Sequence, residues 1–565
     1  MHFLVLNLQT IIYVPWFLIM RLVLIILLLF FMKMGFFYAD GFQVLAEEKQ
    51  ENSIYIKKLT INGDLTSSEL EKIRNIEEKY IKKNLEIEEI FNLAQEIEKY
   101  FRDVGFILTQ VFIPEQEIVN GVLQLEIEKG TLDFDNPIEV FPKDTRLKKQ
   151  IAESYFGSIT KGSINLQKIN KSIQALNEVP GVNYSSISFK KGKAPGTTTI
   201  GLTVDEENLI TGSFGINNHG HKYTGSYLAN YKLNLNNPTG FGDLININTL
   251  SSVQPEDKFF SYDMGYGFPI GRNGIRGKLA VNAVEYELGD KFKTTPSTGG
   301  RVAKYTLDLN KSLKRNSHNH LDFVTSLEFK NIKSQSVGNE IANKSVNKAS
   351  FGLIFKPNPK TPSPIFANLI IKATAGNLDL SKNVDLLEAD NLLGTSGTAG
   401  DFIKANVEAS LIARVSSGFR VKLNTSYQTS DKNLDDSEKL TLGGFNSIRA
   451  FPLGEVTGSE GISALLEAEF LFRNYKDKIF SSITFFYDGG ASRNFVITDN
   501  IASNIENNET LEGWGIGFKT EISERLQLDL KWANPLHKSN TDSNSKNSEG
   551  EIMKSRVWLS SEFKF

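Results

Sequence analysis

The C-terminal two-thirds of the chain repeats one pattern, in which about ten residues alternate apolar with polar before a turn interrupts. Within residues 260–268, for example, aromatic side chains and Met264 alternate with Ser261, Asp263 and two glycines. Alternation puts every second side chain on the same face of a strand. A barrel that is apolar outside and polar inside needs this arrangement along every strand. Residues 209–565 are therefore predicted to form a transmembrane β-barrel.

The connections between these segments support a barrel of antiparallel strands. About sixteen strands are expected, an even number as in bacterial barrels, and short turns alternate with long polar loops. Short turns fall at 237–240 and 416–418, among others. Long loops are expected near residues 288–300, 332–346, 376–401, 429–461, 489–510 and 534–553. The alternative is a large soluble all-β protein with ordinary hairpins.

Residues 1–46 are predicted to be a signal peptide. An unbroken apolar run at 22–31 follows Arg21, and Val44-Leu45-Ala46 offers a small-residue cleavage site. The apolar stretch from Met1 is long for a signal peptide, so Met20 is an alternative start. The competing interpretation is a retained transmembrane helix.

Residues 47–131 and 132–208 are predicted to form two α+β modules with the same element order, β-α-α-β-β, which is an internal repeat. In the first, Thr66 and Glu69 form a capping box that starts a helix. Its strands and second helix are expected at 54–61, 87–101, 106–113 and 122–128. The elements of the second module are expected at 131–141, 146–155, 164–176, 183–189 and 197–204.

Composition narrows the chemistry that the chain can carry. It contains no cysteine, so disulfides and thiolate metal sites are excluded. A formal net charge of -3 offers no basic signal for nucleic acid. Six histidines are present, but they form no evident cluster with carboxylates and a nucleophile. We therefore expect no enzyme, no cofactor and no metal site.

Several short segments resemble those of one family, the transporters of two-partner secretion (TpsB, the ShlB/FhaC/HecB type) within the Omp85 superfamily. The resemblance covers essentially everything after the signal peptide. It implies two polypeptide-transport-associated (POTRA) domains followed by a sixteen-stranded barrel. The segments are Gly105-Phe106, Pro114-Glu115-Gln116, Gly121-Val122, Lys129-Gly130, Leu176-Asn177, Val179-Pro180-Gly181-Val182, Asn217-Asn218-His219-Gly220, Thr224-Gly225 and Asn237-Pro238.

A more specific motif lies in the long loop at 429–461. Ile448-Arg449-Ala450-Phe451 looks like the superfamily's loop-6 signature, Val-Arg-Gly-Tyr. The aromatic change to Phe451 is conservative. The change to Ala450 matters more, because alanine would be strained wherever the backbone needs a positive φ.

A second motif, Phe486-x-Asp488-x-Gly490, matches the family's Phe-x-Asp-x-Gly on the thirteenth strand. Asp488 has the parity opposite to Ile483 and Phe485, so its side chain is predicted to face the lumen. The resemblance implies that Arg449 folds into the barrel and pairs with Asp488. The planar guanidinium suits this because it can grip a carboxylate with two hydrogen bonds. The alternative is that Arg449 is an ordinary solvated loop cation.

The resemblance also implies a location and a task. The barrel would lie in outer-membrane lipid, inserted by barrel-assembly machinery that reads the terminal Phe565, with the modules in the periplasm. A monomer or weak dimer would recognise a large exoprotein of adhesin or haemolysin type in extended form. It would export that partner unfolded through the barrel without ATP (type V secretion).

The edge strand predicted at 106–113 is the candidate site for the partner, because an exposed edge can accept an extended chain as an extra strand. A helix face beside it would form a groove. The alternative is that these apolar residues fill only the core of the module. The candidate residues are Ile97, Phe101, Phe106, Leu108, Gln110 and Phe112.

Other functions remain open at this point. An Omp85-type outer-membrane assembly and insertion factor shares the barrel and both motifs, but normally carries more modules. A passive porin would gain nothing from periplasmic modules. Some family members carry a helix before the first module that plugs the pore, for which residues 47–53 are too short. We therefore expect loop 6 alone to close the pore, which would conduct ions more readily than in plugged relatives. The identity and activity of the exported partner do not follow from the sequence.

Overall fold

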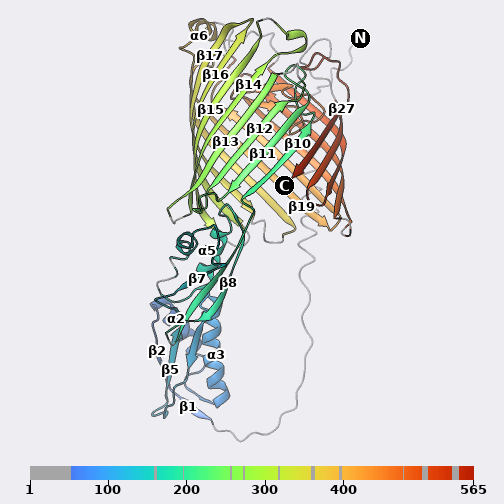
Figure 1. Cartoon of the computed structure of the whole chain (residues 1–565). Helices are drawn as coiled ribbons and strands as arrows, with labels where there is room; N and C mark the ends of the chain where they lie inside the picture. Colours follow the sequence, from blue (N-terminus) through green and yellow to red (C-terminus); the bar gives the residue numbers. More distant parts are fainter. Residues whose placement is uncertain are drawn as a thin grey trace, which may run out of the picture.

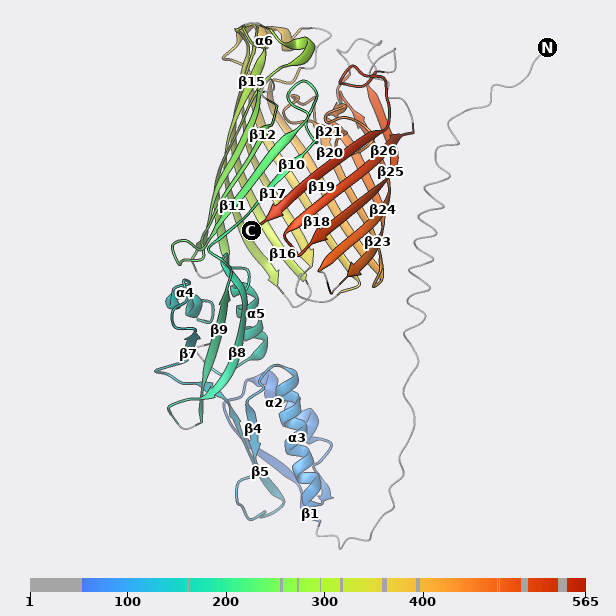
Figure 2. The same cartoon turned by 45° about the vertical axis from the view of Figure 1, so that its right-hand side comes forward.

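The computed structural model describes residues 53–565 apart from 158, 160–161, 195, 255–257, 272–273, 295, 316–318, 358–362, 393–396, 475, 477, 499–506 and 537–545. The predicted signal peptide therefore lies outside the described residues. Figures 1 and 2 show two small α+β modules stacked end to end beneath a barrel of tilted strands. The predicted fold class, α+β modules followed by a sixteen-stranded antiparallel barrel, is confirmed.

The first module is a three-stranded sheet covered by helices. Strand β5 lies in the centre, parallel to β2 and antiparallel to β4. Leu93, Ile97 and Phe101, on one face of helix α3, are fully buried in the core beneath the sheet. The capping box forms as predicted, since Thr66 N donates to Glu69 Oε2 at 2.7 Å. The elements are β1 (Ile54–Ile56), β2 (Lys58–Asn62), α2 (Ser67–Glu77), β3 (Lys83–Leu85), α3 (Ile87–Asp103), β4 (Thr109–Phe112) and β5 (Val122–Lys129).

The second module repeats this plan, but its first two strands, β6 and β7, both pair with β9, whereas β1 of the first module pairs with β3. The single strand expected at 131–141 is divided into β6 and β7, because Asp133 turns the chain. Its carboxylate accepts hydrogen bonds from the backbone N–H groups of Ala194, Asn136, Lys193 and Asp135, which lower the pKa of Asp133 to about 2. The elements are β6 (Thr131–Leu132), β7 (Ile138–Phe141), α4 (Lys149–Ser154), α5 (Leu166–Leu176), β8 (Val182–Lys191) and β9 (Thr197–Glu206).

Direct contacts join the second module to the barrel. Lys148 N donates to Gly240 O at 2.9 Å, and the Lys148 ammonium lies 3.4 Å from the centre of the Phe241 ring. Gly240 and Phe241 belong to the first barrel turn on the side of the modules, residues 237–243. Near the start of the barrel strand β16 (Asn319–Ser336), His320 Nδ1 lies 2.8 Å from Glu178 Oε1 of the module. These contacts hold the module at one end of the lumen.

The barrel closes on itself through pairing of its first and last strands. Connections at the end next to the modules are short, from the two residues 417–418 to the seven residues 237–243. The longest connections at the far end are 431–459, 380–399 and 536–555. The sixteen strands are β10 (Ile210–Asn217), β11 (Leu228–Asn236), β12 (Leu244–Ser252), β13 (Lys258–Ile270), β14 (Ile275–Glu287), β15 (Gly299–Arg315), β16 (Asn319–Ser336), β17 (Asn339–Pro357), β18 (Ile365–Asp379), β19 (Gly400–Ser416), β20 (Phe419–Ser430), β23 (Glu460–Asn474), β24 (Ile479–Arg493), β25 (Asn508–Ile522), β26 (Leu526–Pro535) and β27 (Arg556–Lys564).

The two faces of the barrel wall differ in the way that the alternation predicts. Large apolar side chains such as Phe260, Met264 and Tyr305 are exposed on the outside, whereas charged side chains such as Lys330 and Glu469 are buried inside. This distribution matches lipid outside and a polar lumen.

The prediction of a long loop at 332–346 is wrong. Strands β16 and β17 continue through this segment and are joined by Val337 and Gly338 alone, with φ of 50° and 80°. Two positive φ values are typical of a tight hairpin turn that suits the strand twist. The polar character of the segment therefore belongs to strands that extend beyond the apolar band of the barrel.

Shorter elements lie in the far-end loops. They include the helix α6 (Val384–Asp390), the turn η2 (Asp290–Phe292) and a small hairpin of β21 (Leu440–Leu442) and β22 (Val456–Gly458). Within the part of the chain that the structure describes, no helix has the length and apolar character needed to cross a membrane.

Candidate functional site

The connection between β20 and β23, residues 431–459, folds back into the barrel and is called loop 6 here. Its tip begins at Gly443 and Gly444, with φ of 98° and 99°, a conformation that suits glycine. The tip is closed by backbone hydrogen bonds, from Gly444 N to Phe451 O at 3.1 Å and from Phe451 N to Ile448 O at 3.2 Å. This compact turn places the side chain of Arg449 in a defined direction.

The structure brings Arg449 and Asp488 together. The guanidinium donates from Nε to Asp488 Oδ2 at 2.8 Å and from Nη2 to Oδ1 at 2.6 Å, and the backbone N–H of Arg449 donates to Oδ2 at 3.1 Å. The remaining nitrogen, Nη1, donates to Glu467 Oε1 on β23 at 2.5 Å. Arg449 is 2% exposed and Asp488 0%. One arginine thus bridges two carboxylates on neighbouring strands of the lumen wall.

Aromatic side chains complete the surroundings of Arg449. The guanidinium carbon lies 3.7 Å from the centre of the Phe486 ring, which places the cation over an aromatic face. Trp558, on the last strand, donates its indole N–H to Arg449 O at 2.7 Å. Sequence reasoning did not find Trp558. Its position in the alternation could have indicated it, because Trp558 is a large aromatic residue at a lumen-facing position of β27.

Glycines of the wall make room for the tip of loop 6. A Cβ atom at Gly490 would lie 2.7 Å from Ile448 Cδ1, and one at Gly513 would lie 2.4 Å from the Cβ of Ala450. The glycine of Phe486-x-Asp488-x-Gly490 is therefore a contact site for the loop. Ala450 does not have a positive φ, so the alanine in the loop-6 signature carries no backbone strain.

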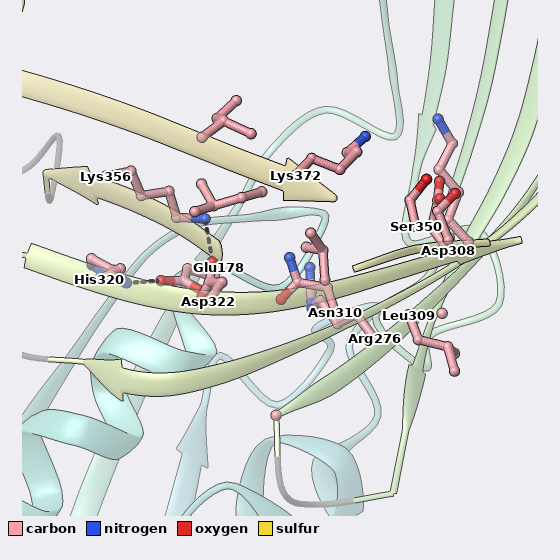
Figure 3. A pocket seen from close by; sticks show the side chains of 18 of the residues that line it. Glu178, Arg276, Asp308, Leu309, Asn310, His320, Asp322, Ser350, Lys356 and Lys372 are labelled. Carbon is pink, nitrogen blue, oxygen red and sulfur yellow. Dashed lines mark ion pairs between the residues drawn. The ribbon is translucent and has the colours of Figure 1, made fainter. Parts of the chain in front are cut away.

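A cavity of about 1050 Å³ lies between this region and the modules. Pro180 and Glu178 of the second module line it together with inward-facing residues of the barrel. Figure 3 shows the end of the cavity next to the module, where Glu178 meets His320, and Asp322 pairs with Lys356 at 2.9 Å. The cavity is thus bounded by both parts of the chain.

The predicted partner-binding residues divide into two groups. Ile97 and Phe101 are fully buried in the core of the first module, so the expectation that they face a partner is wrong. They lie on the core side of an amphipathic helix, as the alternative interpretation held. Phe106 packs partly buried against the same core, and Leu108 packs against the core of the second module.

Gln110 and Phe112 project from the outer face of β4, and Phe112 is 41% exposed. Among the described strands, β4 pairs with β5 alone, so it is an edge strand. One of its outward donors is already in use, because Val111 N donates to Glu98 Oε1 on α3 at 3.0 Å.

A closed barrel that is apolar outside, holds a loop in a charged lumen and follows two small modules defines an Omp85-type outer-membrane transporter. Residues 55–130 match the model of the POTRA domain, ShlB-type. Residues 196–520 match the model of the haemolysin secretion/activation protein ShlB/FhaC/HecB, and the chain belongs to this family of two-partner secretion transporters. The barrel therefore lies in the outer membrane and the POTRA modules in the periplasm.

Other known proteins are similar to this chain in sequence or in structure. The heme/hemopexin transporter protein HuxB of Haemophilus influenzae (strain 86-028NP) is 24% identical over 531 residues, which cover 91% of this chain and 88% of HuxB. CdiB from Escherichia coli is similar in structure, with a TM-score of 0.72, 18% identity and 93% of each chain covered. BamA from Haemophilus ducreyi lacking POTRA domains 1–3 has a TM-score of 0.52 and 13% identity, covering 91% of this chain and all of that one. The two structural likenesses concern the fold alone.

The close approach of Ala450 to Gly513 leads to a test of loop docking. Gly513→Ala should release the tip of loop 6, because overpacking of this kind costs about 1–3 kcal/mol. Ala450→Gly should restore docking in the double variant, since it removes the opposing Cβ. Val456→Cys, on the buried hairpin strand β22, gives a reporter in a chain without other cysteines, and maleimide labelling measures release.

The matched control for this test is Gly489→Ala. A Cβ atom at Gly489 would meet its nearest neighbour, Tyr487, at an ordinary 3.7 Å, so labelling should stay at the wild-type rate. Equal labelling of the Gly513→Ala and Gly489→Ala proteins would contradict the role given to Gly513.

Proposed function

We propose that the protein recognises a large secreted exoprotein and exports it in extended form through its own barrel, with loop 6 as the internal gate. The observation that carries this proposal is the buried Arg449, which ties a loop from the far end of the barrel to Asp488 and Glu467 inside the lumen. A loop so placed occupies space that a passing chain would need. Its anchor is polar and built from few contacts, so it can be undone and remade.

The energetics of the anchor suit a gate. Hydrogen bonds to charged groups contribute about 1.5–3 kcal/mol each, and removal of one partner from a buried ion pair typically costs about 3–5 kcal/mol. A lumen contains water, which weakens such pairs relative to a dry core. The Arg449 anchor would therefore define a single closed position without making that position permanent.

Recognition of the partner would begin at the POTRA modules. We propose that an extended segment of the exoprotein adds to the free edge of β4, where backbone hydrogen bonds give affinity with little demand on sequence. Because Val111 N is bonded to Glu98, the incoming strand would displace this carboxylate. Gln110 and Phe112, on the outer face, would contact side chains of the partner. We propose a partner of adhesin or haemolysin type because the chain belongs to a family of haemolysin secretion/activation proteins.

From the modules, the route would lead through the cavity at Glu178 and Pro180 into the lumen. The lumen wall carries charges of both signs, for example Glu467, Lys422 and Glu469 on adjacent strands. Mixed charge disfavours tight binding of one sequence, which suits a conduit. Folding of the partner outside the cell would bias its movement outward without ATP.

Assembly of other barrels into the membrane is the second candidate function. The likeness to BamA supports a shared fold but comes with 13% identity. The number of modules and the matched family favour export over assembly.

The role of Arg449 is tested by secretion of the partner at equal surface abundance. Arg449→Ala and Asp488→Ala should each reduce secretion strongly, because each leaves a buried charge without its partner. Arg449→Lys should rescue only partly, since an ammonium cannot form two parallel bonds to a carboxylate.

Arg493 provides a matched control on the same strand as Asp488. It pairs with Glu460 at 3.3 Å, but its side chain is 48% exposed, so Arg493→Ala should secrete normally. If Arg449→Ala and Asp488→Ala also secreted normally, neither residue would have the role proposed here.

Recognition by the β4 edge is tested by freeing its blocked donor. With Glu98→Ala, Val111 N is open to a partner strand. Capture of the exoprotein from the secreted proteome by residues 47–208 should then increase. The increase in affinity should be about tenfold if the freed donor adds about 1.4 kcal/mol to the binding free energy. Glu88→Ala, an exposed carboxylate on the same helix, should leave capture unchanged. A decrease with Glu98→Ala at unchanged module stability would argue against strand addition at this edge.

The energy source is tested with purified protein in liposomes. Secretion-competent partner should cross the membrane without any nucleotide. No translocation by a barrel shown to be folded would exclude this mechanism.

A further inference from the structure

Loop 6 has a second polar anchor, on a part of the wall that Arg449 does not reach. Glu438, in the descending arm of the loop, has a side chain that is 2% exposed. Its carboxylate lies 2.6 Å from the Nζ of Lys330 on β16, 2.9 Å from that of Lys348 on β17 and 2.8 Å from that of Lys404 on β19. These three lysines are called the lysine cage.

The cage has more positive than negative charge in the wall itself. Glu328, the cross-strand neighbour of Lys348, lies 2.9 Å from Lys348 and 3.8 Å from Lys330. Among the described carboxylates, Glu438 is the one within 4.0 Å of Lys404. Without the loop, three ammonium groups would share one wall carboxylate. Like charges held this close repel, so the cage needs a carboxylate from elsewhere.

The cage can be approached from the periplasmic side. Lys348, Lys404 and Glu328 also line the cavity that begins at the second POTRA module. Lys356, at the module end of this cavity in Figure 3, lies eight residues from Lys348 on the same strand, which corresponds to about 27 Å. An extended chain entering at the modules would therefore reach the lysines that Glu438 holds from the opposite side.

We propose that the lysine cage is a binding site for a carboxylate side chain of the exported polypeptide, which Glu438 occupies while the barrel is closed. This inference rests on the export function proposed above and adds the chemistry of recognition inside the lumen. Glu438 takes the position between the three Nζ atoms, so an incoming carboxylate competes with it for the same N–H donors. An acidic segment in the cage therefore displaces Glu438 and loosens loop 6, and the loop in turn competes with the segment.

A purely structural anchor would have the same contacts but would not respond to a ligand. The test uses the full chain purified in detergent, with hexaglutamate as the probe and Val456→Cys as the reporter of loop release. Hexaglutamate should raise maleimide labelling of this cysteine about tenfold, within the usual range of coupling between two sites. Hexaglutamine, which has the same length and no charge, should not change labelling.

Variants of the cage separate binding from folding. Lys348→Gln with Lys404→Gln should abolish the response to hexaglutamate, whereas Lys372→Gln, another cavity lysine on β18, should keep it. Glu438→Gln leaves the lysines intact and should both raise basal labelling and lower the hexaglutamate concentration needed for binding. This second variant decides the matter if the double variant fails to fold. No response in the wild type and in Glu438→Gln would overturn the proposal.

Secretion assays distinguish failure of this proposal from failure of the export function. In one outcome, cells with the wild-type protein export no partner while hexaglutamate still releases loop 6. This result would support the cage as a carboxylate-binding site and contradict the export function. If Lys348→Gln with Lys404→Gln exports its partner at the wild-type rate, export stands and the cage has no part in recognition.

Discussion

Closure of the barrel is the constraint on which the rest of the structure depends. Lipid offers no hydrogen-bond partners, so every strand that crosses it must be paired on both edges. The first and last strands meet over five residue pairs, from Ser213 with Lys564 to Asn217 with Ser560. Beyond these pairs, the side chain of Asn218 continues the pairing of the two strands. It accepts a hydrogen bond from Leu559 N at 2.7 Å and donates one to Val557 O at 2.9 Å. Closure here creates both the membrane-facing surface and the lumen.

A closed lumen confines charges that would otherwise be fully hydrated. Charged groups taken out of water need partners, and single unpaired charges are costly. Loop 6 supplies those partners for two separate parts of the wall. Arg449 satisfies Asp488 and Glu467, and Glu438 satisfies the lysine cage. While it is docked, the loop therefore provides counterions for both parts of the wall.

The position of the modules follows from the same geometry. The second module packs on the barrel turn at 237–243 through Lys148 and meets the start of β16 through Glu178 and His320. Its surface thereby becomes one boundary of the cavity that leads towards loop 6. Partner recognition at the modules and gating in the lumen would thus be adjacent steps along one path.

The sequence by itself determined the features that depend on local periodicity. Strand alternation predicted sixteen strands and the inward direction of Asp488, and helical spacing predicted the two modules. The tertiary structure decided the rest: the burial of Ile97 and Phe101, the tight turn at Val337, and the contacts of loop 6 with Trp558 and with the lysine cage. Periodicity states which face a side chain occupies, but not how deep it lies or which distant segment covers it. Those properties arise only when strands far apart in the chain close around one lumen.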